Sequence, residues 1–100
     1  MKINFVRTLR TQSSERFLLL KGDKDIGALD VHYLINGSVA ATVIILDSSN
    51  FPPSNVPSLL NKIDEILFPD LSIGEKNLVF TVVTGCVIGT FLPEDNSNED

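Results

Sequence analysis

Tryptophan is absent from this sequence, and cysteine and histidine each occur only once. The single cysteine, Cys86, excludes a disulfide within the chain, which suits a reducing compartment. One cysteine and one histidine (His32) cannot form a zinc site without carboxylates or a second chain. We therefore expect a cytoplasmic protein without a metal or a cofactor.

Long hydrophobic runs are also missing. The longest apolar runs are about five residues, far below the ~20 residues that span a bilayer. The first ten residues, MKINFVRTLR, contain neither a long apolar stretch nor a small-residue cleavage site, so they do not resemble a secretory signal. These absences predict a soluble protein with no membrane partner.

Positive charge is scarce outside the N-terminal quarter. The net charge is −5, but residues 1–24 carry +4 and residues 25–100 carry −9. The acidic total argues against nucleic acid as the main partner. We interpret the basic segment 1–24 as a solvated edge of the domain, because runs of charged residues usually serve solubility.

What is present is an ordinary globular composition, with 43% hydrophobic and 21% charged residues in a chain of 100. This size predicts one domain, over residues 1–92. The polar and acidic residues 93–100 (PEDNSNED) predict a disordered tail.

The hydrophobic pattern predicts an α+β fold in the order β-β-β-β-α-β. β-Prone runs indicate the first four strands, over residues 2–9, 16–21, 26–35 and 38–46. A helix is expected over 55–67, with Ser54 as its cap and an apolar stripe along one face. Residues 77–92 are interpreted as one long strand bent at Gly85, with a second hairpin at Thr84-Gly85 as the alternative. The whole is an antiparallel β-meander of about five strands, with one amphipathic helix packed on one face.

Asn36-Gly37 is the strongest local signal, because Asn-Gly is the preferred two-residue type I′ hairpin turn. Such a turn places Leu34 opposite Val39 and sets which side chains share a face. The predicted register leaves an apolar face that the single helix cannot cover. We expect this face to be an interface, formed by Leu34, Val39, Val43 and Ile45, through which the chain self-associates or binds a protein partner.

His32 and Asp30 are the weak candidates for chemistry, since both lie on one face of a strand and an Asp–His pair can act as a base and its orienting group. No nucleophile motif accompanies them. The sequence therefore favours a small non-catalytic interaction or regulatory module, acting as a homodimer or as a subunit of a complex. The alternatives are a small enzyme or ligand-binding domain with a site at His32 and Asp30 across a dimer, and an acidic antitoxin or immunity protein that neutralises a basic partner.

Overall fold

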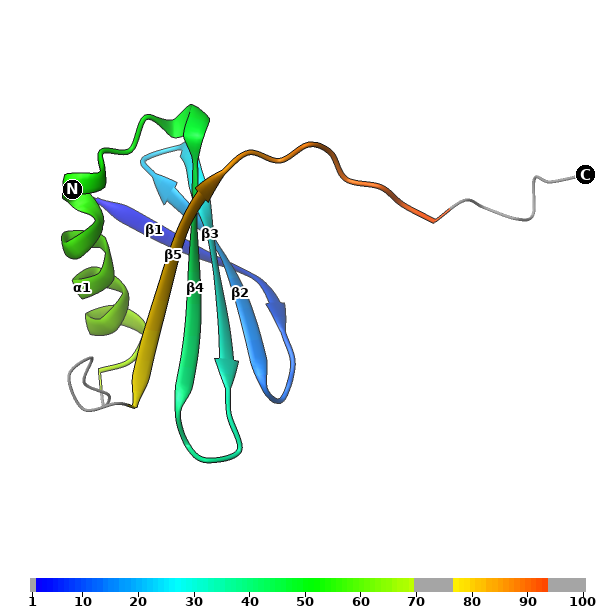
Figure 1. Ribbon diagram of the computed structural model, residues 1–100, viewed down its shortest axis with the longest axis vertical. Coiled ribbons are helices and arrows are strands. Elements are labelled where there is room, and N and C mark those ends of the chain that lie inside the picture. The colour runs from blue at the N-terminus through cyan, green and yellow to red at the C-terminus, as the bar shows by residue number, and fades with distance from the viewer. Residues whose placement is uncertain (1, 70–76, 94–100) are drawn as a thin grey trace, which may run out of the picture.

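A computed structural model describes residues 2–69 and 77–93 and shows the expected α+β fold (Figure 1). Five strands form one sheet in the order β1-β2-β3-β4-β5. The strands are β1 (Ile3–Arg10), β2 (Ser14–Lys21), β3 (Lys24–Tyr33), β4 (Val39–Leu46) and β5 (Leu78–Gly85). The first four pair antiparallel as a meander, which confirms the fold class predicted from the hydrophobic pattern.

Helix α1 (Val56–Leu67) connects β4 to β5, and β5 therefore runs parallel to β4. The sheet is thus mixed, whereas the expected meander was antiparallel throughout. A short 3₁₀ turn, Pro53–Asn55, precedes the helix, and Asn55 stands at the N-cap position without a side-chain hydrogen bond. The cap expected at Ser54 is thus wrong. Pro57 lies in the first turn, where backbone N–H groups have no partner within the helix.

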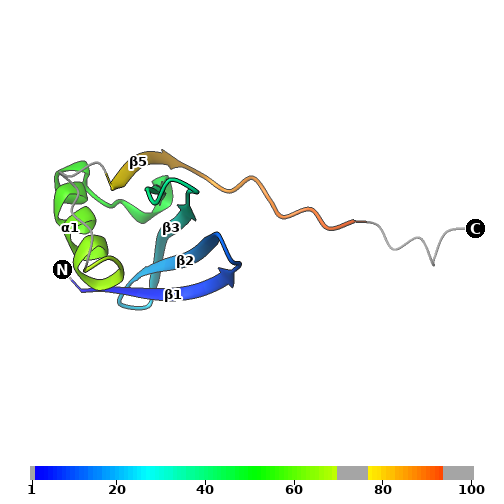
Figure 2. The same cartoon turned by 90° about the horizontal axis from the view of Figure 1, so that it is seen from below.

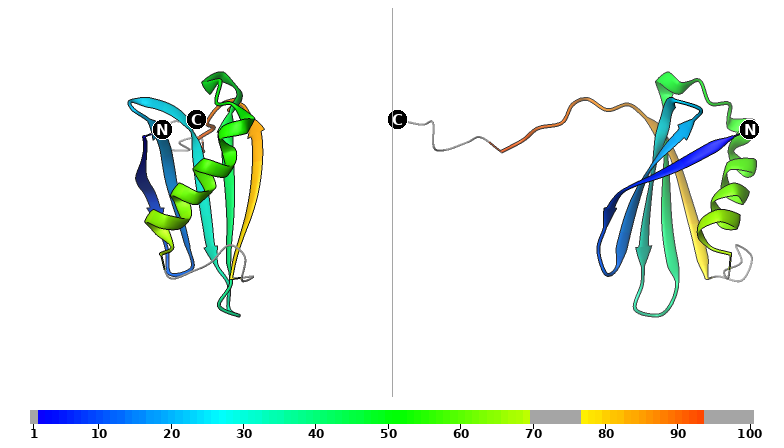
Figure 3. Two further views of the ribbon diagram at one scale, coloured as in Figure 1. Left: turned by 90° about the vertical axis from the view of Figure 1, so that its left-hand side faces the viewer. Right: turned by 180° about the vertical axis from the view of Figure 1, so that it is seen from behind.

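The core lies between the helix and one face of the sheet (Figure 2). Leu59 and Ile63 of the helix are fully buried, and they belong to one cluster with side chains from all five strands. The strand members with the least exposure are Leu19, Ile26, Leu29, Val31 and Val43. In the described part of the chain, no helix lies on the opposite face of the sheet (Figure 3).

The β3–β4 hairpin has a three-residue loop rather than the expected two-residue turn. The N–H of Gly37 donates to the carbonyl of Leu34 at 3.0 Å, and the N–H of Leu34 donates to the carbonyl of Ser38 at 2.9 Å. Only Gly37 of the Asn-Gly pair has a positive φ, +86°, whereas a type I′ turn requires positive φ at both central residues. The loop therefore combines a four-residue turn with a glycine bulge.

This extra loop residue shifts the register by one, so that Tyr33 pairs with Val39. A shift of one residue moves every β4 side chain to the other face. Three of the expected interface residues, Val39, Val43 and Ile45, are consequently packed in the core with exposures of 4%, 0% and 3%. The fourth, Leu34, lies beside the hairpin loop with 47% exposure.

Replacement of Gly37 by valine is expected to lower the free energy of unfolding by about 1–3 kcal/mol, the cost of one residue held in a strained backbone region. Nothing lies within 4 Å of a Cβ placed at Gly37, so the loss comes from the backbone alone. Urea unfolding of the two proteins measures it. A variant as stable as the wild type would show that the loop adopts another conformation at no cost.

The segment 77–92 is neither one bent strand nor a hairpin. Strand β5 ends at Gly85, and residues 86–93 continue outside the sheet (Figure 1). The acidic tail expected at 93–100 lies outside the described residues, apart from Pro93.

Candidate functional site

An apolar row crosses the helix-free face of the sheet. Directly paired residues on neighbouring strands form this row, which we call the apolar stripe: Val6, Leu18, Ala28, Ile44 and Val83. Val6 and Val83 at its two ends are 44% and 43% exposed, and the three central residues are partly exposed. Cross-strand neighbours on one face lie close enough to form a continuous surface.

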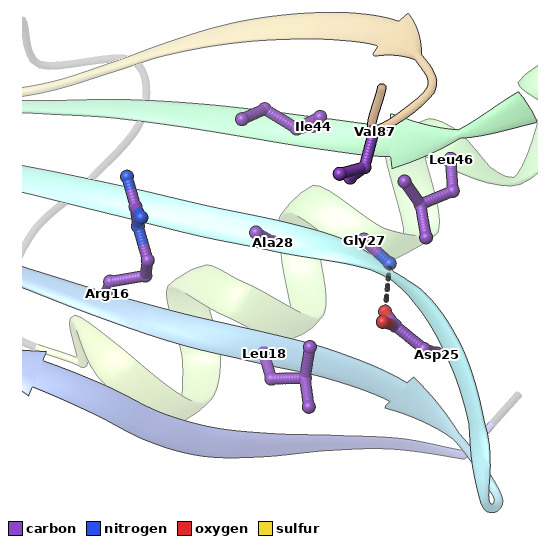
Figure 4. Close-up of a pocket in the computed structure, with 8 residues that line it drawn as sticks. All are labelled: Arg16, Leu18, Asp25, Gly27, Ala28, Ile44, Leu46 and Val87. Carbon is purple, nitrogen blue, oxygen red and sulfur yellow. Dashed lines mark hydrogen bonds between the residues drawn. The ribbon is translucent and has the colours of Figure 1, made fainter. Parts of the chain in front are cut away.

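The middle of the stripe is hollow because β3 contributes small residues there. Ala28 and the adjacent Gly27 lie between Leu18 on one side and Ile44 and Leu46 on the other (Figure 4). The hollow has a volume of about 300 Å³. It is large enough to accept a bulky apolar side chain.

Gly27 lies next to a β-bulge in β3, and this bulge sets its position opposite β2. Leu19 pairs with Gly27 and Leu20 pairs with Asp25, so Ile26 is the extra residue, and its side chain is buried in the core. The Asp25 carboxylate accepts a hydrogen bond of 3.0 Å from the Gly27 N–H. A Cβ at Gly27 would lie 1.8 Å from the Ile44 carbonyl oxygen, so only glycine fits against β4 here.

The two residues predicted to carry chemistry lie in two successive cross-strand rows beside the apolar stripe, with Asp30 in the nearer row and His32 in the next. Asp30 is bound by Arg16, whose Nε and Nη2 donate at 2.5 Å and 3.0 Å, and this contact raises the pKa of the Arg16 guanidinium. His32 is exposed on the same face, opposite Ser14 and Ala40 in the register. The structure thus brings Asp30 to Arg16, and the orienting contact to His32 expected of a catalytic pair is replaced by this ion pair.

Residues 86–92, which we call the C-terminal arm, carry four large apolar side chains that are exposed to solvent. Val87, Ile88, Phe91 and Leu92 are 70%, 92%, 85% and 83% exposed. The arm leaves the sheet on the side opposite the helix and points away from the stripe (Figures 1 and 2). Val87 alone contributes to the lining of the hollow.

The two edges of the sheet differ in charge. Strand β1 carries Arg7 and Arg10, and charged side chains protect an edge against pairing with another chain. Strand β5, with the sequence LVFTVVTG, has no charged residue, and neither does the arm that follows it. The uncharged edge and the arm are therefore continuous.

Sequence reasoning missed Glu15, which is 5% exposed on the helix side of β2. Its Oε1 lies 2.8 Å from Arg7 Nε and 2.8 Å from Arg10 Nη1, and its Oε2 accepts a hydrogen bond from the Tyr33 hydroxyl. Burial favours the neutral acid, but the Tyr33 hydrogen bond and the two arginines outweigh it and lower the pKa of Glu15. Burial and the contact with Glu15 raise the pKa of Tyr33 to about 12.

This cluster is a structural clamp between three strands. The Arg7 guanidinium also lies 5.6 Å from the centre of the Phe17 ring, a favourable cation–π distance. The sequence gives no sign that Glu15 is buried, because its partners lie on two other strands, β1 and β3, and are brought to it only by the fold.

Within residues 2–69 and 77–93, no three histidine, cysteine or acidic side chains are placed to hold a metal ion. The helix in this part of the chain is too short and too polar to cross a membrane. Cys86 is exposed where the arm begins.

Comparison of the chain with protein-family models, with curated proteins and with solved structures finds no match.

Proposed function

We propose that this protein is a non-catalytic interaction module that binds a protein partner, most simply a second copy of itself, through the helix-free face of its sheet. The apolar stripe is the observation that carries this proposal. It is a continuous row of apolar residues across all five strands, with the hollow at its centre. Contiguous apolar surface of this kind marks interaction sites in soluble proteins.

The pairing of Asp30 with Arg16 supports the non-catalytic assignment. The hydrogen bonds of the Asp30 carboxylate in the structure come from the Arg16 guanidinium and not from His32, so the carboxylate does not hold the imidazole in a fixed orientation. The proposal also retains a cytoplasmic location, for which the exposed single thiol of Cys86 is the support.

Replacement of Ile44 by aspartate is expected to weaken self-association by at least ~30-fold, the effect of losing one central contact residue. A charge on the stripe would have to lose its water when the face is covered. Sedimentation at micromolar concentration measures the effect, and binding of a hydrophobic dye reports whether the face is open.

Ile35→Asp is the matched control, because Ile35 is fully exposed in the hairpin loop, away from the stripe. We expect this variant to associate like the wild type. A wild-type chain that sediments as an 11.0 kDa monomer and binds no hydrophobic dye would refute the proposed function.

A further inference from the structure

We infer that two copies of this chain exchange their C-terminal arms, so that the arm of each copy lies on the apolar stripe of the other, with Phe91 in the hollow over Gly27 and Ala28. The inference rests on the proposed function and specifies its partner and binding mode. Its occupant is a second copy of this chain.

The direction of the arm is the first argument. It leaves the end of β5 on the helix-free side and points away from the sheet, so its residues beyond Val87 do not cover the stripe of their own chain (Figures 2 and 3). When the helix-free faces of two copies turn toward each other, each arm points toward the face of the other copy.

The dimensions of the arm and the stripe agree. The stripe crosses five strands, and with neighbouring strands about 4.8 Å apart it is ~19 Å long. Residues 86–92 in an extended conformation reach ~23 Å at about 3.3 Å per residue. With Phe91 at the centre of the stripe, residues 86–90 reach ~17 Å back from it at about 3.3 Å per residue. The arm is therefore long enough to cross from one end of the stripe to the hollow, a distance of ~10 Å.

The shapes are also complementary. Ala28 and Gly27 make the hollow, and Leu18 and Ile44 form its walls. Phe91 is the largest exposed side chain of the arm, at 85% exposure, and aromatic anchors in pockets dominate protein interfaces. The arm has no charged residue, so none of its own charges loses water when it enters the hollow. Arg16 and Asp25 also line the hollow, and they already have partners in Asp30 and in the Gly27 N–H.

The buried area suits a stable dimer. Each arm carries four large apolar side chains with at least 70% exposure. In an extended arm, Val87 and Phe91 point to one side and Ile88 and Leu92 to the other, so an arm held between the two facing sheets buries all four. A single phenylalanine buries roughly 150–250 Å². A two-fold arrangement repeats the contact. Two arms and two stripes together reach the range of about 1,200–2,000 Å² that specific complexes bury.

The test uses full-length variants labelled at the N-terminal amine, because the single cysteine, Cys86, belongs to the arm itself. The face variant is Ile44→Asp, with an intact arm. The arm variant combines Ile88→Asp with Phe91→Asp, and it keeps an intact face; both side chains lie outside the sheet, at 92% and 85% exposure. One variant carries a donor dye and the other an acceptor dye.

Arm exchange predicts energy transfer in the mixture of the two variants, since the arm of the face variant can still occupy the intact face of the arm variant. Each variant alone is expected to associate at least ~30-fold more weakly than the wild type. The affinity of the mixed pair should lie between the affinity of the wild type and that of each variant alone, because the mixed pair retains one of the two arm contacts.

Ala28→Leu is the second variant, needed in case Ile44→Asp fails to fold. Leucine fills the hollow and makes the face more apolar, so arm docking predicts association at least ~10-fold weaker, the effect of overfilling a packed site. Unchanged or tighter association of Ala28→Leu would overturn the inference in favour of simple contact between the two faces.

Two further outcomes separate this inference from the proposed function. An arm variant that still dimerises like the wild type, or a wild-type monomer that binds the hydrophobic dye, overturns arm exchange and leaves the interaction module standing. A monomer that binds no dye overturns both.

Discussion

Replacement of Gly27 by alanine is expected to lower the free energy of unfolding by about 3–5 kcal/mol, because the added Cβ combines backbone strain with a clash. The φ of Gly27 is +155°, and the Cβ would lie 1.8 Å from the Ile44 carbonyl oxygen and 2.9 Å from its carbonyl carbon. These are backbone atoms of a central strand, so they cannot move without separating β3 from β4. A domain of this size has only about 5–15 kcal/mol of stability, and the variant is therefore expected to unfold at a much lower denaturant concentration.

Gly85→Ala is the matched control for this effect. Gly85 also lies in a strand, its φ is not positive, and nothing lies within 4 Å of a Cβ placed there. We expect its free energy of unfolding, measured with urea, to stay within about 0.5 kcal/mol of the wild type, the range of a neutral surface change. Equal stability of Gly27→Ala and Gly85→Ala would show that β3 and β4 do not approach each other this closely.

The strands of the meander and the helix could be predicted because their signals are local, whereas the order of the strands in the sheet was left open. Alternating and continuous apolar runs specified the strands, and the apolar positions of helix α1 specified its buried face, with Leu59 and Ile63 fully buried. Short turns between consecutive strands then imply a meander. These elements agree with the structure.

The register could not be predicted, since it depended on a single loop residue. Asn36-Gly37 indicates a hairpin, but the pair fits both a two-residue turn and a three-residue loop with a glycine bulge. Ile35 belongs to the loop, where it is fully exposed. This one residue exchanged the two faces of β4, placing Ile44 on the open face and Val43 in the core.

The sequence predicted a second apolar face and assigned particular residues to it, and these two predictions have different outcomes. An uncovered apolar face is present, but it consists of the stripe of Val6, Leu18, Ala28, Ile44 and Val83. Leu18 and Ala28 belong to it because β2 and β3 pair across a bulge, and a bulge has no reliable sequence sign. The extended arm was also missed, because apolar β-prone residues resemble a strand whether or not a neighbouring strand is available in the same chain.

Replacement of Glu15 by glutamine is expected to lower the free energy of unfolding at pH 7 by about 1–3 kcal/mol, the usual contribution of hydrogen bonds to a charged group. Glutamine keeps the shape of the side chain and removes its charge. Arg7 and Arg10 then face each other without the carboxylate between them, and the Tyr33 hydroxyl loses a charged acceptor. The two arginines are more than half exposed, at 54% and 57%, so water partly compensates for the loss.

The difference in the free energy of unfolding between the wild type and Glu15→Gln should become smaller as the pH falls. The pKa of Glu15 in the folded chain lies below its ordinary value of 4.5, so its charge stabilises the fold above about pH 4.5. This stabilisation is lost as the pH falls through the lowered pKa, where Glu15 becomes a neutral acid similar in shape to glutamine. Urea unfolding of both proteins between pH 7 and pH 3 should therefore give a difference that shrinks toward zero at the acid end.

Glu65→Gln, at an exposed position on the helix, is the control, and it should differ from the wild type by less than ~0.5 kcal/mol throughout. A Glu15→Gln difference that stays constant down to pH 3 would mean that the side chain contributes through its packing and not through its charge.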